Sequence, residues 1–485
     1  MRRKIVLPLA LPAAWLGVVL AGLLVFLRHW GYDDPYITYR YAENLRSGLG
    51  FVYNPGTRTL STTTPLWTLL LAVLRNPWLD MPVLADVLSA LSLVAGAWGL
   101  FLLGRRWETP WAGWTALLVY PLFPLLLSTT GSETPLYLTL GIWAVLAYVE
   151  GRYAWSGLLL ALTTLARPDG ILLAGVLGAD YLWGCLRQQK GQPPAREAVP
   201  RGLPWGGLAA FGIPLLLWGG FAWAYFGNPL PVTLAAKRAQ GRMAISPDFF
   251  AGLGRVLGWY NRHPYLLLAA LALLGAVFLW RERSRWALFL AWPLVYFAAY
   301  ALLGVSSYFW YYAPLVPGLV VLAGLGVEGL IRRAAGWPYR WLIAVFLVLA
   351  VLPWLGRSLV RMPQHNDKRL RAYRAAGVWL RENTPPDASV GMLEVGIIGY
   401  YARRPVVDFA GLIQPEVAAQ MNAASTYQDT ALWAVERYHP DYLLLHDGLF
   451  PRLEETAERF CEPAHRFRGA DYGYNADLTV YACRW

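Results

Sequence analysis

The first 356 residues of the chain alternate long apolar runs with short polar segments. Most of these runs approach the ~20 residues that an α-helix needs to cross the hydrocarbon core of a bilayer, so the pattern predicts a polytopic α-helical membrane protein. The apolar segment at 65–74 is shorter than a span and is expected to lie in the membrane interface or to re-enter it. We expect about 11 transmembrane helices, at residues 5–27, 81–103, 110–127, 133–150, 153–166, 169–186, 205–226, 264–280, 286–303, 312–331 and 341–356.

The pattern changes after residue 356. A charged, helix-like segment at 367–383 is followed by four short apolar runs of the kind that form β-strands, "SVGMLEV", "PVVDFA", "DYLLLHD" and "LTVYAC". This composition is that of an ordinary soluble domain. The sequence therefore predicts a membrane domain at 1–356 and a soluble α/β domain at 357–485.

Composition and charge agree with this division. Hydrophobic residues make up 57% of the chain and charged residues only 15%, which excludes a single soluble domain of 485 residues. The net charge of +12 comes largely from short basic clusters between apolar runs, which is typical of the positive-inside rule rather than of a nucleic-acid-binding face. These clusters contain Arg2, Arg3, Lys4, Arg105, Arg106, Arg152, Arg187, Lys190, Arg196, Arg201, Arg281, Arg283, Arg285, Arg332, Arg333 and Arg340.

Loops placed alternately on the two sides of the membrane, from a cytoplasmic N-terminus, give a consistent topology. The basic clusters then face the cytoplasm, and we expect a multi-pass protein of the cytoplasmic membrane with an extracytoplasmic C-terminal domain. Within that domain Cys461 and Cys483 are the two cysteines that could pair. The outer side also receives the loops at 28–80, 128–134, 166–170, 227–263 and 304–312.

Two adjacent carboxylates, Asp33 and Asp34, follow the first apolar run. Pro35 and the helical spacing behind it predict a short amphipathic helix along the membrane surface. Two carboxylates this close repel each other, so their pKa values move apart and the two groups can take different roles. One can accept the proton of an attacking hydroxyl, while the other binds a cation or a second hydroxyl. The alternative is a helix cap, with Asp34 preceding Pro35 at the first helical position.

The longer stretch "DDPYITYRYAENLRSGLGFVYNPG…STTTPLW" resembles the first outer loop of GT-C glycosyltransferases. It is most similar to the bacterial arabinofuranosyltransferase-like and mannosyltransferase-like enzymes that use polyprenyl-phosphate sugars. The resemblance implies the GT-C fold, with Asp33 as the general base and Asp34 as its partner.

Two further outer loops carry candidate residues. Glu133 precedes an apolar run, where the resemblance implies acceptor or metal binding and the alternative is a helix cap. Arg167 in "LARPDG" is either a cation for the donor phosphate or part of a turn in which it pairs with Asp169, and related sequences carry an Arg-Pro-acid turn at this place. The oxygens of Asp33, Asp34 and Glu133 are compatible with a Mg²⁺ or Ca²⁺ ion.

The loop "GNPLPVTLAAKRAQG" supplies a basic pair, Lys237 and Arg238. An ammonium and a guanidinium suit the phosphate of a lipid donor, and the alternative is snorkelling to lipid headgroups. The stretch resembles a motif of the same enzymes in which Leu-Pro-Asn-Thr is followed by an Ala-Lys pair, with Val232 in place of the Asn. The resemblance implies Lys237 as the motif's lysine, and the departure at Val232 leaves the local backbone geometry open.

Two more segments hold candidates. In the aromatic cluster at 308–312, Tyr308 and Tyr311 are expected at the donor site, with a membrane-belt anchor as the alternative. In the C-terminal region, Glu394 and Asp408 either support packing, which we favour, or contact an acceptor glycan.

These features favour an inverting glycosyltransferase that moves a sugar from a polyprenyl-phosphate donor to a hydroxyl group of a glycan, lipid or protein during cell-envelope assembly. The sequence has no P-loop, Rossmann fingerprint, HExxH or CxxC motif, so no nucleotide cofactor is expected. The alternatives are a transporter or lipid flippase that uses the outer acids for ion coupling, and a non-catalytic receptor. The apolar runs carry little charge and no internal repeat, which argues against transport.

Overall fold

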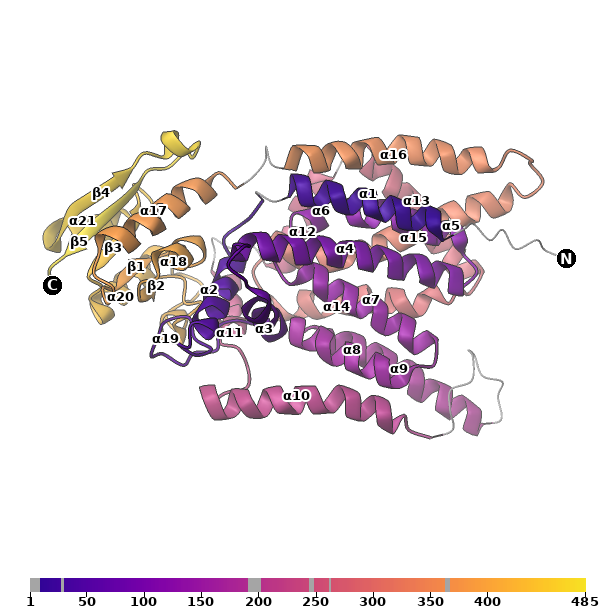
Figure 1. The fold of residues 1–485 in the computed structure, drawn as a ribbon, viewed down its shortest axis with the longest axis horizontal. Helices are drawn as coiled ribbons and strands as arrows, with labels where there is room; N and C mark the ends of the chain where they lie inside the picture. The colour runs from indigo at the N-terminus through magenta and orange to yellow at the C-terminus, as the bar shows by residue number, and fades with distance from the viewer. Residues whose placement is uncertain (1–8, 28–29, 191–201, 244–247, 261–262, 363–366) are drawn as a thin grey trace.

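The computed structural model describes residues 9–27, 30–190, 202–243, 248–260, 263–362 and 367–485. It has two parts, a bundle of helices and a smaller C-terminal domain that contains a β-sheet (Figure 1). The expected cytoplasmic residues that lie outside the described residues are Arg2, Arg3, Lys4, Arg196 and Arg201.

A helix or a broken helix forms at each apolar run, because a backbone in lipid has to satisfy its hydrogen bonds within the segment. Pro121 and Pro124 divide the expected run at 110–127 into α5, η1 and α6, since proline has no amide hydrogen with which to continue a helix. The elements of this part are α1 (Ala10–Phe26), α2 (Pro35–Arg46), α3 (Pro65–Leu74), α4 (Met81–Arg106), α5 (Pro110–Val119), η1 (Tyr120–Leu122), α6 (Pro124–Leu127), α7 (Thr134–Val149), α8 (Tyr153–Ala166), α9 (Gly170–Gln189), α10 (Trp205–Phe226), α11 (Thr233–Arg242), α12 (Phe249–Trp259), α13 (Tyr265–Arg281), α14 (Trp286–Leu303), η2 (Phe309–Tyr311), η3 (Ala313–Leu315), α15 (Val316–Arg333) and α16 (Trp341–Arg361).

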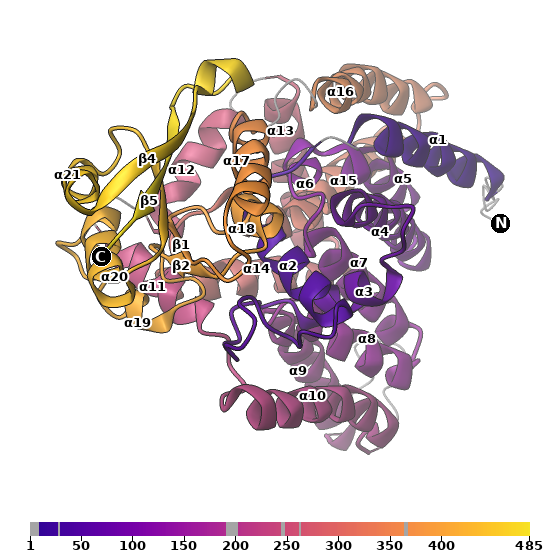
Figure 2. The same ribbon diagram turned by 60° about the vertical axis from the view of Figure 1, so that its left-hand side comes forward.

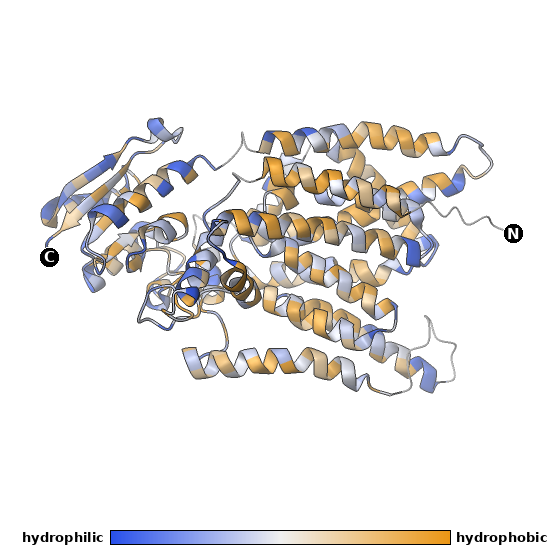
Figure 3. Ribbon diagram, in the orientation of Figure 1, coloured by the Kyte–Doolittle hydropathy of each residue, from blue (hydrophilic) through white to orange (hydrophobic). Residues whose placement is uncertain are grey.

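The bundle is that of a polytopic membrane protein. Apolar residues dominate its helices (Figure 3), and apolar side chains such as Leu216 and Leu302 stay 75% and 88% exposed, as lipid contact requires. Within the described part of the chain, six segments are long and apolar enough to span a membrane, and the expected count of 11 stays a prediction. These segments are Met81–Arg106, Gly170–Gln189, Trp205–Phe226, Trp286–Leu303, Phe309–Arg333 and Trp341–Arg361.

The C-terminal domain begins later than expected, because α16 continues past residue 356 to Arg361. Its strands form one five-stranded sheet in the order β2-β1-β3-β5-β4. The pairs β1–β2 and β1–β3 are parallel, and β5 runs antiparallel to both β3 and β4. The elements are α17 (Arg369–Asn383), β1 (Val390–Met392), α18 (Ile397–Ala402), β2 (Val406–Asp408), α19 (Pro415–Ala418), α20 (Tyr427–Tyr438), β3 (Tyr442–His446), α21 (Pro451–Phe460), β4 (Cys461–Phe467), η5 (Gly469–Tyr472) and β5 (Leu478–Cys483).

The four expected strands coincide with β1, β2, β3 and β5, whereas β4 was not predicted. β4 is an edge strand whose middle residues are all exposed, so no apolar pattern marks it. Its first residue, Cys461, lies opposite Cys483 of β5, and the two form a disulfide. The structure therefore contains the disulfide between the two cysteines that the sequence identified as able to pair.

Arg40 of α2 joins the first outer loop to the C-terminal domain. Its side chain is buried, and its guanidinium donates hydrogen bonds to the carbonyl oxygens of Tyr53 (2.9 Å), Gly399 (2.8 Å) and Arg404 (2.6 Å). Asn54 of the same loop adds a pair of bonds to the backbone of Val406 (2.8 and 3.0 Å). One charged side chain thus satisfies three carbonyl groups at the contact between the two parts.

We predict that Arg40→Met loosens this contact. The substitution removes three hydrogen bonds from a charged donor, each of which contributes about 1.5–3 kcal/mol. The carbonyl oxygens of Tyr53 and Gly399 keep a second donor, in the side chain of Asn44 and the amide of Arg403. The apparent Tm of the detergent-solubilised protein should fall by several degrees, and amide exchange should increase in α18. Arg46→Met is the control, because Arg46 lies on the same helix but is exposed and bonds only to the carbonyl of Arg75. Equal Tm values for the two variants would contradict the prediction.

Candidate active site

Two cavities meet between the bundle and the C-terminal domain. The polar cavity, of about 450 Å³, lies between the first loop, α11, α12, η2 and the C-terminal domain. The lateral cavity, of about 350 Å³, lies between the first loop, the start of α9, α11 and the end of α14, and the exposed apolar side chains of Ile171, Leu230 and Leu234 line it. Both cavities are lined by Tyr32, Asp34, Lys237, Trp310 and Leu412.

Asp33 lines the polar cavity and is held by the C-terminal domain. Its two carboxylate oxygens accept hydrogen bonds from the amides of Gly396 (3.0 Å) and Ile397 (2.8 Å), at the start of α18. Burial and the nearby carboxylate of Glu394 raise the pKa of Asp33 to about 7, although the Ile397 amide and Arg369 oppose the rise. Asp33 is therefore a carboxylate poised to exchange a proton near neutral pH.

Asp34 has different surroundings. It precedes α2 at the N-cap position, but its side chain makes no capping hydrogen bond, so the capping alternative is not seen. Its carboxylate lies 3.6 Å from the ammonium of Lys237, and this ion pair stands where the two cavities meet. The two adjacent acids therefore face different groups: Asp33 faces the C-terminal domain, and Asp34 faces the ammonium of Lys237.

Lys237 is buried on α11, with its ammonium 3.9 Å from the ring centre of Tyr308. Burial lowers the pKa of Lys237, but Asp34 and Tyr308 outweigh it and raise the pKa above its usual value, so the side chain stays charged. Arg238, the other member of the expected basic pair, is exposed and lines neither cavity. Adjacent residues of a helix point in directions about 100° apart, which separates the pair.

Hydrogen bonds to carbonyl groups of the first loop hold the start of α11, where Val232 stands in place of the motif's asparagine. The amide of Val232 donates to the carbonyl of Leu60 (2.9 Å), and the hydroxyl of Thr233 donates to the carbonyl of Ser61 (2.8 Å). At the other end, the Gln240 amide donates to the Ala410 carbonyl (3.1 Å). The replacement by Val232 therefore leaves Lys237 between the first loop and the C-terminal domain.

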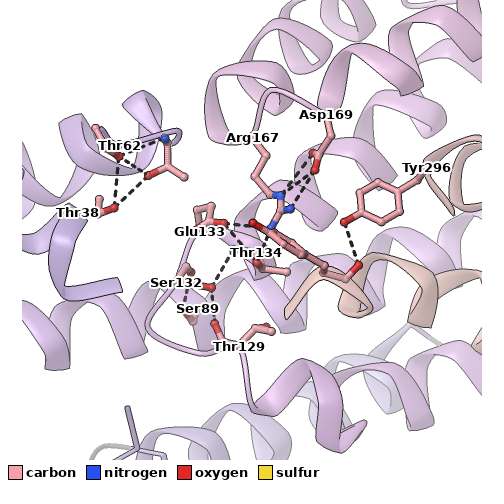
Figure 4. Close-up of polar contacts among 12 residues, drawn as sticks. Thr38, Thr62, Ser89, Thr129, Ser132, Glu133, Thr134, Arg167, Asp169 and Tyr296 are labelled. Atoms are coloured by element: carbon pink, nitrogen blue, oxygen red, sulfur yellow. Dashed lines mark hydrogen bonds and ion pairs between the residues drawn. The ribbon is translucent and has the colours of Figure 1, made fainter. Parts of the chain in front are cut away.

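Glu133 and Arg167 lie together at the lateral cavity (Figure 4). Arg167 contacts Glu133 (3.2 Å) and Asp169 (3.0 Å), and the hydroxyl of Tyr300 donates to Asp169 (2.6 Å). Arg167 thus forms the ion pair with Asp169 that a turn role predicts. Its side chain also lines the lateral cavity.

The hydroxyl groups of Thr38, Thr62 and Thr64 form a second polar cluster on the wall of the lateral cavity, with oxygens 3.1–3.4 Å apart (Figure 4). The two candidate tyrosines are divided between the cavities. Tyr308 lines the polar cavity and donates to Gln240 (3.1 Å), whereas Tyr311 lines the lateral cavity. The lateral cavity therefore combines hydroxyl groups and a guanidinium with an apolar rim.

The expected divalent-cation site does not fit this arrangement. Among the described residues, no group of three His, Cys, Asp or Glu side chains is placed to hold a metal ion. Glu133 pairs with Arg167, and Lys237 occupies the position beside Asp34, so these two acids already have cationic partners. We derive no step that involves a metal.

The C-terminal domain also contributes residues to the polar cavity. Glu394, for which the sequence offered either packing or contact with an acceptor glycan, lines the cavity and pairs with Arg369 (3.3 Å). Asp408 does support packing: it is fully buried and accepts the amides of Ala410 (2.7 Å) and Ile413 (2.8 Å) within its own turn. No local pattern identifies the further lining residues, which include Gln240, Arg255, Trp259, Asp367, Arg369 and Tyr427.

We predict a pH-dependent difference in stability between the wild type and Asp33→Asn. The folded pKa of about 7 lies above the unfolded value of about 3.9, so the unfolded chain loses this proton first as the pH rises. The stability of the wild type relative to the variant should therefore fall between about pH 4 and pH 7 and stay level above that range. Thermal unfolding in detergent across pH 4–8.5 measures it.

Glu394→Gln provides the companion test, because it removes a charge that raises the pKa of Asp33. When Glu394→Gln is present in both proteins, the stability difference that Asp33→Asn causes should stop changing at a lower pH than in the wild-type background. An unchanged range would show that Glu394 does not act on Asp33.

Comparisons with known proteins follow the two parts of the chain. The domain of unknown function DUF8728 matches residues 362–481, which are nearly the whole C-terminal domain. Over 188 residues the chain is 33% identical to the terminal β-(1→2)-arabinofuranosyltransferase of Mycobacterium tuberculosis. The match covers 35% of this chain and 28% of that protein, so the chain spans well under half the length of this relative.

Two solved structures resemble nearly the whole chain. ArnT from Cupriavidus metallidurans, in a structure bound to undecaprenyl phosphate, has a TM-score of 0.61 at 17% identity over 98% of this chain and 97% of that chain. AglB from Archaeoglobus fulgidus, an archaeal oligosaccharyltransferase in complex with an inhibitory peptide and a dolichol-phosphate, has a TM-score of 0.60 at 15% identity over 98% of this chain and 74% of that chain. The chain therefore shares its overall fold with these two proteins.

Proposed function

We propose that the protein is an inverting glycosyltransferase that moves a sugar from a polyprenyl-phosphate donor to a hydroxyl acceptor. The observation that carries the proposal is the meeting of a polar and a lateral cavity at the Asp34–Lys237 ion pair, directly beside Asp33. The undecaprenyl phosphate of the ArnT structure and the dolichol-phosphate of the AglB structure support this class of donor. The name of the M. tuberculosis relative supports sugar transfer and leaves the sugar itself open.

The donor occupies the lateral cavity in this proposal. Its isoprenoid chain leaves along the apolar rim, and its phosphate lies against the ammonium of Lys237, where the hydroxyl groups of Thr62 and Thr64 can donate hydrogen bonds. Arg167 adds positive charge at the same wall, positioned by Glu133. Tyr311 lies on the donor side as expected, Tyr308 supports Lys237 from the other cavity, and Arg238 takes no part.

The acceptor occupies the polar cavity, with its hydroxyl at Asp33. Asp33 takes the hydroxyl proton while the hydroxyl oxygen forms a bond to the anomeric carbon of the donor sugar. The bond from that carbon to the phosphate oxygen breaks on the opposite face, and its electrons leave with the polyprenyl phosphate. Lys237 neutralises the charge that grows on this leaving group, so no acid has to protonate it. Attack opposite to departure inverts the anomeric centre.

The reaction takes place at the outer face of the cytoplasmic membrane in this proposal, and serves cell-envelope glycan or glycolipid assembly. The disulfide between Cys461 and Cys483 supports an oxidising compartment for the C-terminal domain. The distribution of Lys and Arg among the loops supports a cytoplasmic N-terminus.

Asp33→Asn tests the general base. Removal of a general base lowers a rate by about 10²–10⁴-fold, and the loss should appear in kcat because the donor contacts remain. The assay measures transfer by the purified protein from polyprenyl-phosphate arabinofuranose and polyprenyl-phosphate mannose to a mixture of saccharide acceptors. Asp387→Asn, at an exposed position of the C-terminal domain, is the control and should keep the wild-type rate.

Two outcomes count against this proposal in different ways. Full activity of Asp33→Asn would mean that another group takes the proton. A wild-type protein that transfers no sugar from any polyprenyl-phosphate donor would show that the proposed reaction class is wrong.

Lys237→Gln and Arg238→Gln separate two adjacent cations. Because only Lys237 borders the cavities, its substitution should weaken inhibition by free polyprenyl phosphate at least tenfold, whereas Arg238→Gln should leave the inhibition constant within twofold. Equal effects at the two positions would assign the phosphate to a general basic surface instead.

A further inference from the structure

A third cavity, the α12 groove, adjoins the polar cavity. It has a volume of about 550 Å³ and lies between α12, α13 and the η3–α15 segment. Leucine, valine, glycine and aromatic residues form nearly all of its wall, and Leu257 and Leu266 at the groove stay 60% and 53% exposed. Exposed apolar side chains in a membrane protein indicate a surface that lipid can reach.

The groove is continuous with the active site and separate from the donor side. Val256 and Tyr312 line both the α12 groove and the polar cavity. By contrast, the α12 groove and the lateral cavity share no lining residue among those that the structure describes. The polar cavity therefore has an apolar extension on each of two sides, and the proposed donor uses only one of them.

Two glycines keep the α12 groove open. Gly254 and Gly258 lie one helical turn apart on α12, both line the groove, and a Cβ atom at either position would meet no atom within 4 Å. Gly252 on the same helix differs, because a Cβ atom there would clash with the side chain of Ser307. Close packing thus explains Gly252, whereas at Gly254 and Gly258 the missing side chains leave space in the groove.

The junction between groove and polar cavity carries a cation and an aromatic ring. Arg255 and Trp259, from the same turns of α12 as the two glycines, line the polar cavity. A guanidinium binds phosphate oxygens through two parallel hydrogen bonds, and an indole ring packs against a sugar face. In the view of Figure 2, α12 appears between the sheet and α17 of the C-terminal domain. Val256 and Tyr312 line both the groove and the polar cavity, so Arg255 and Trp259 lie where an apolar chain would pass into the saccharide-binding space.

We infer that the acceptor is a lipid-linked saccharide whose apolar chain lies in the α12 groove, with an anionic phosphate link at Arg255 and its sugar in the polar cavity. This inference rests on the proposed function and names the acceptor class that the function leaves open. Donor and acceptor then enter from the membrane on different sides of the Asp34–Lys237 pair, and each presents its polar group to the same cavity.

Gly254→Trp tests the groove, since a Cβ atom at this position meets no atom within 4 Å and the indole adds bulk at a residue that lines the groove. Gly220→Trp is the matched control: this glycine of α10 also has no atom within 4 Å of a Cβ position, and it lines none of the three cavities. The binding probe is a saccharide joined by phosphate to a prenyl chain that carries a photoreactive diazirine. It should label peptides of α12, α13 and α15 in the wild type and Gly220→Trp, and label them at least tenfold less in Gly254→Trp.

The labelling needs no turnover, so it reports on the groove even if no sugar is transferred. Label on α9, α11 and α14 would place the chain in the lateral cavity and overturn the inference. Equal labelling of α12 in the two variants would do the same.

Transfer kinetics give the second measurement. The wild type should use the prenyl-phosphate-linked acceptor at least tenfold more efficiently, in kcat/KM, than the methyl glycoside of the same saccharide. Gly254→Trp should raise KM at least tenfold for the lipid-linked acceptor alone, with the donor KM unchanged. A raised donor KM, or equal loss with both acceptors, would contradict the acceptor role. Labelling of the groove without any transfer would instead contradict the proposed function.

Discussion

The C-terminal domain is attached to the first outer loop by two charged side chains that satisfy the opposite ends of one short helix. Asp33 accepts amide hydrogens at the start of α18, and Arg40 donates to carbonyl oxygens at and beyond its end. An acid at the positive end and a base at the negative end of a helix are each favoured by its dipole. The polar cavity depends on this contact, because the loop supplies one wall and the C-terminal domain the opposite one.

The same contact makes two adjacent acids unlike. Burial and the neighbouring carboxylate of Glu394 raise the pKa of Asp33 to about 7, against the opposing effect of the Ile397 amide that its carboxylate accepts. Asp34 has no such bond and faces Lys237. A carboxylate with a raised pKa suits proton transfer, and a carboxylate paired with lysine suits the placement of a cation. The different roles proposed for Asp33 and Asp34 thus follow from the groups that each side chain faces.

The membrane gives the site its second constraint. Reactants that are attached to lipid chains cannot leave the bilayer, so a transferase for them needs apolar access beside its polar centre. The lateral cavity and the α12 groove provide two such openings, and they meet the polar cavity on different sides. In the proposed reaction the separation matters because the acceptor hydroxyl and the leaving phosphate lie on opposite faces of the donor's anomeric carbon. A single shared opening would place the two chains in competition.

The sequence alone determined the helices and the α/β character of the C-terminal domain, because hydrophobic periodicity and strand patterns are local features. It also predicted Asp33, Asp34 and Lys237 as site residues from a local family motif. It did not reveal β4, whose middle side chains are exposed, or the proline break in the run at 110–127. It offered both Lys237 and Arg238 for the donor phosphate, whereas only Lys237 borders the cavities among the described residues. Only the tertiary structure decided which of these side chains share a cavity: residues 33, 237 and 394 are distant along the chain, and their meeting depends on how the helix bundle and the C-terminal domain pack together.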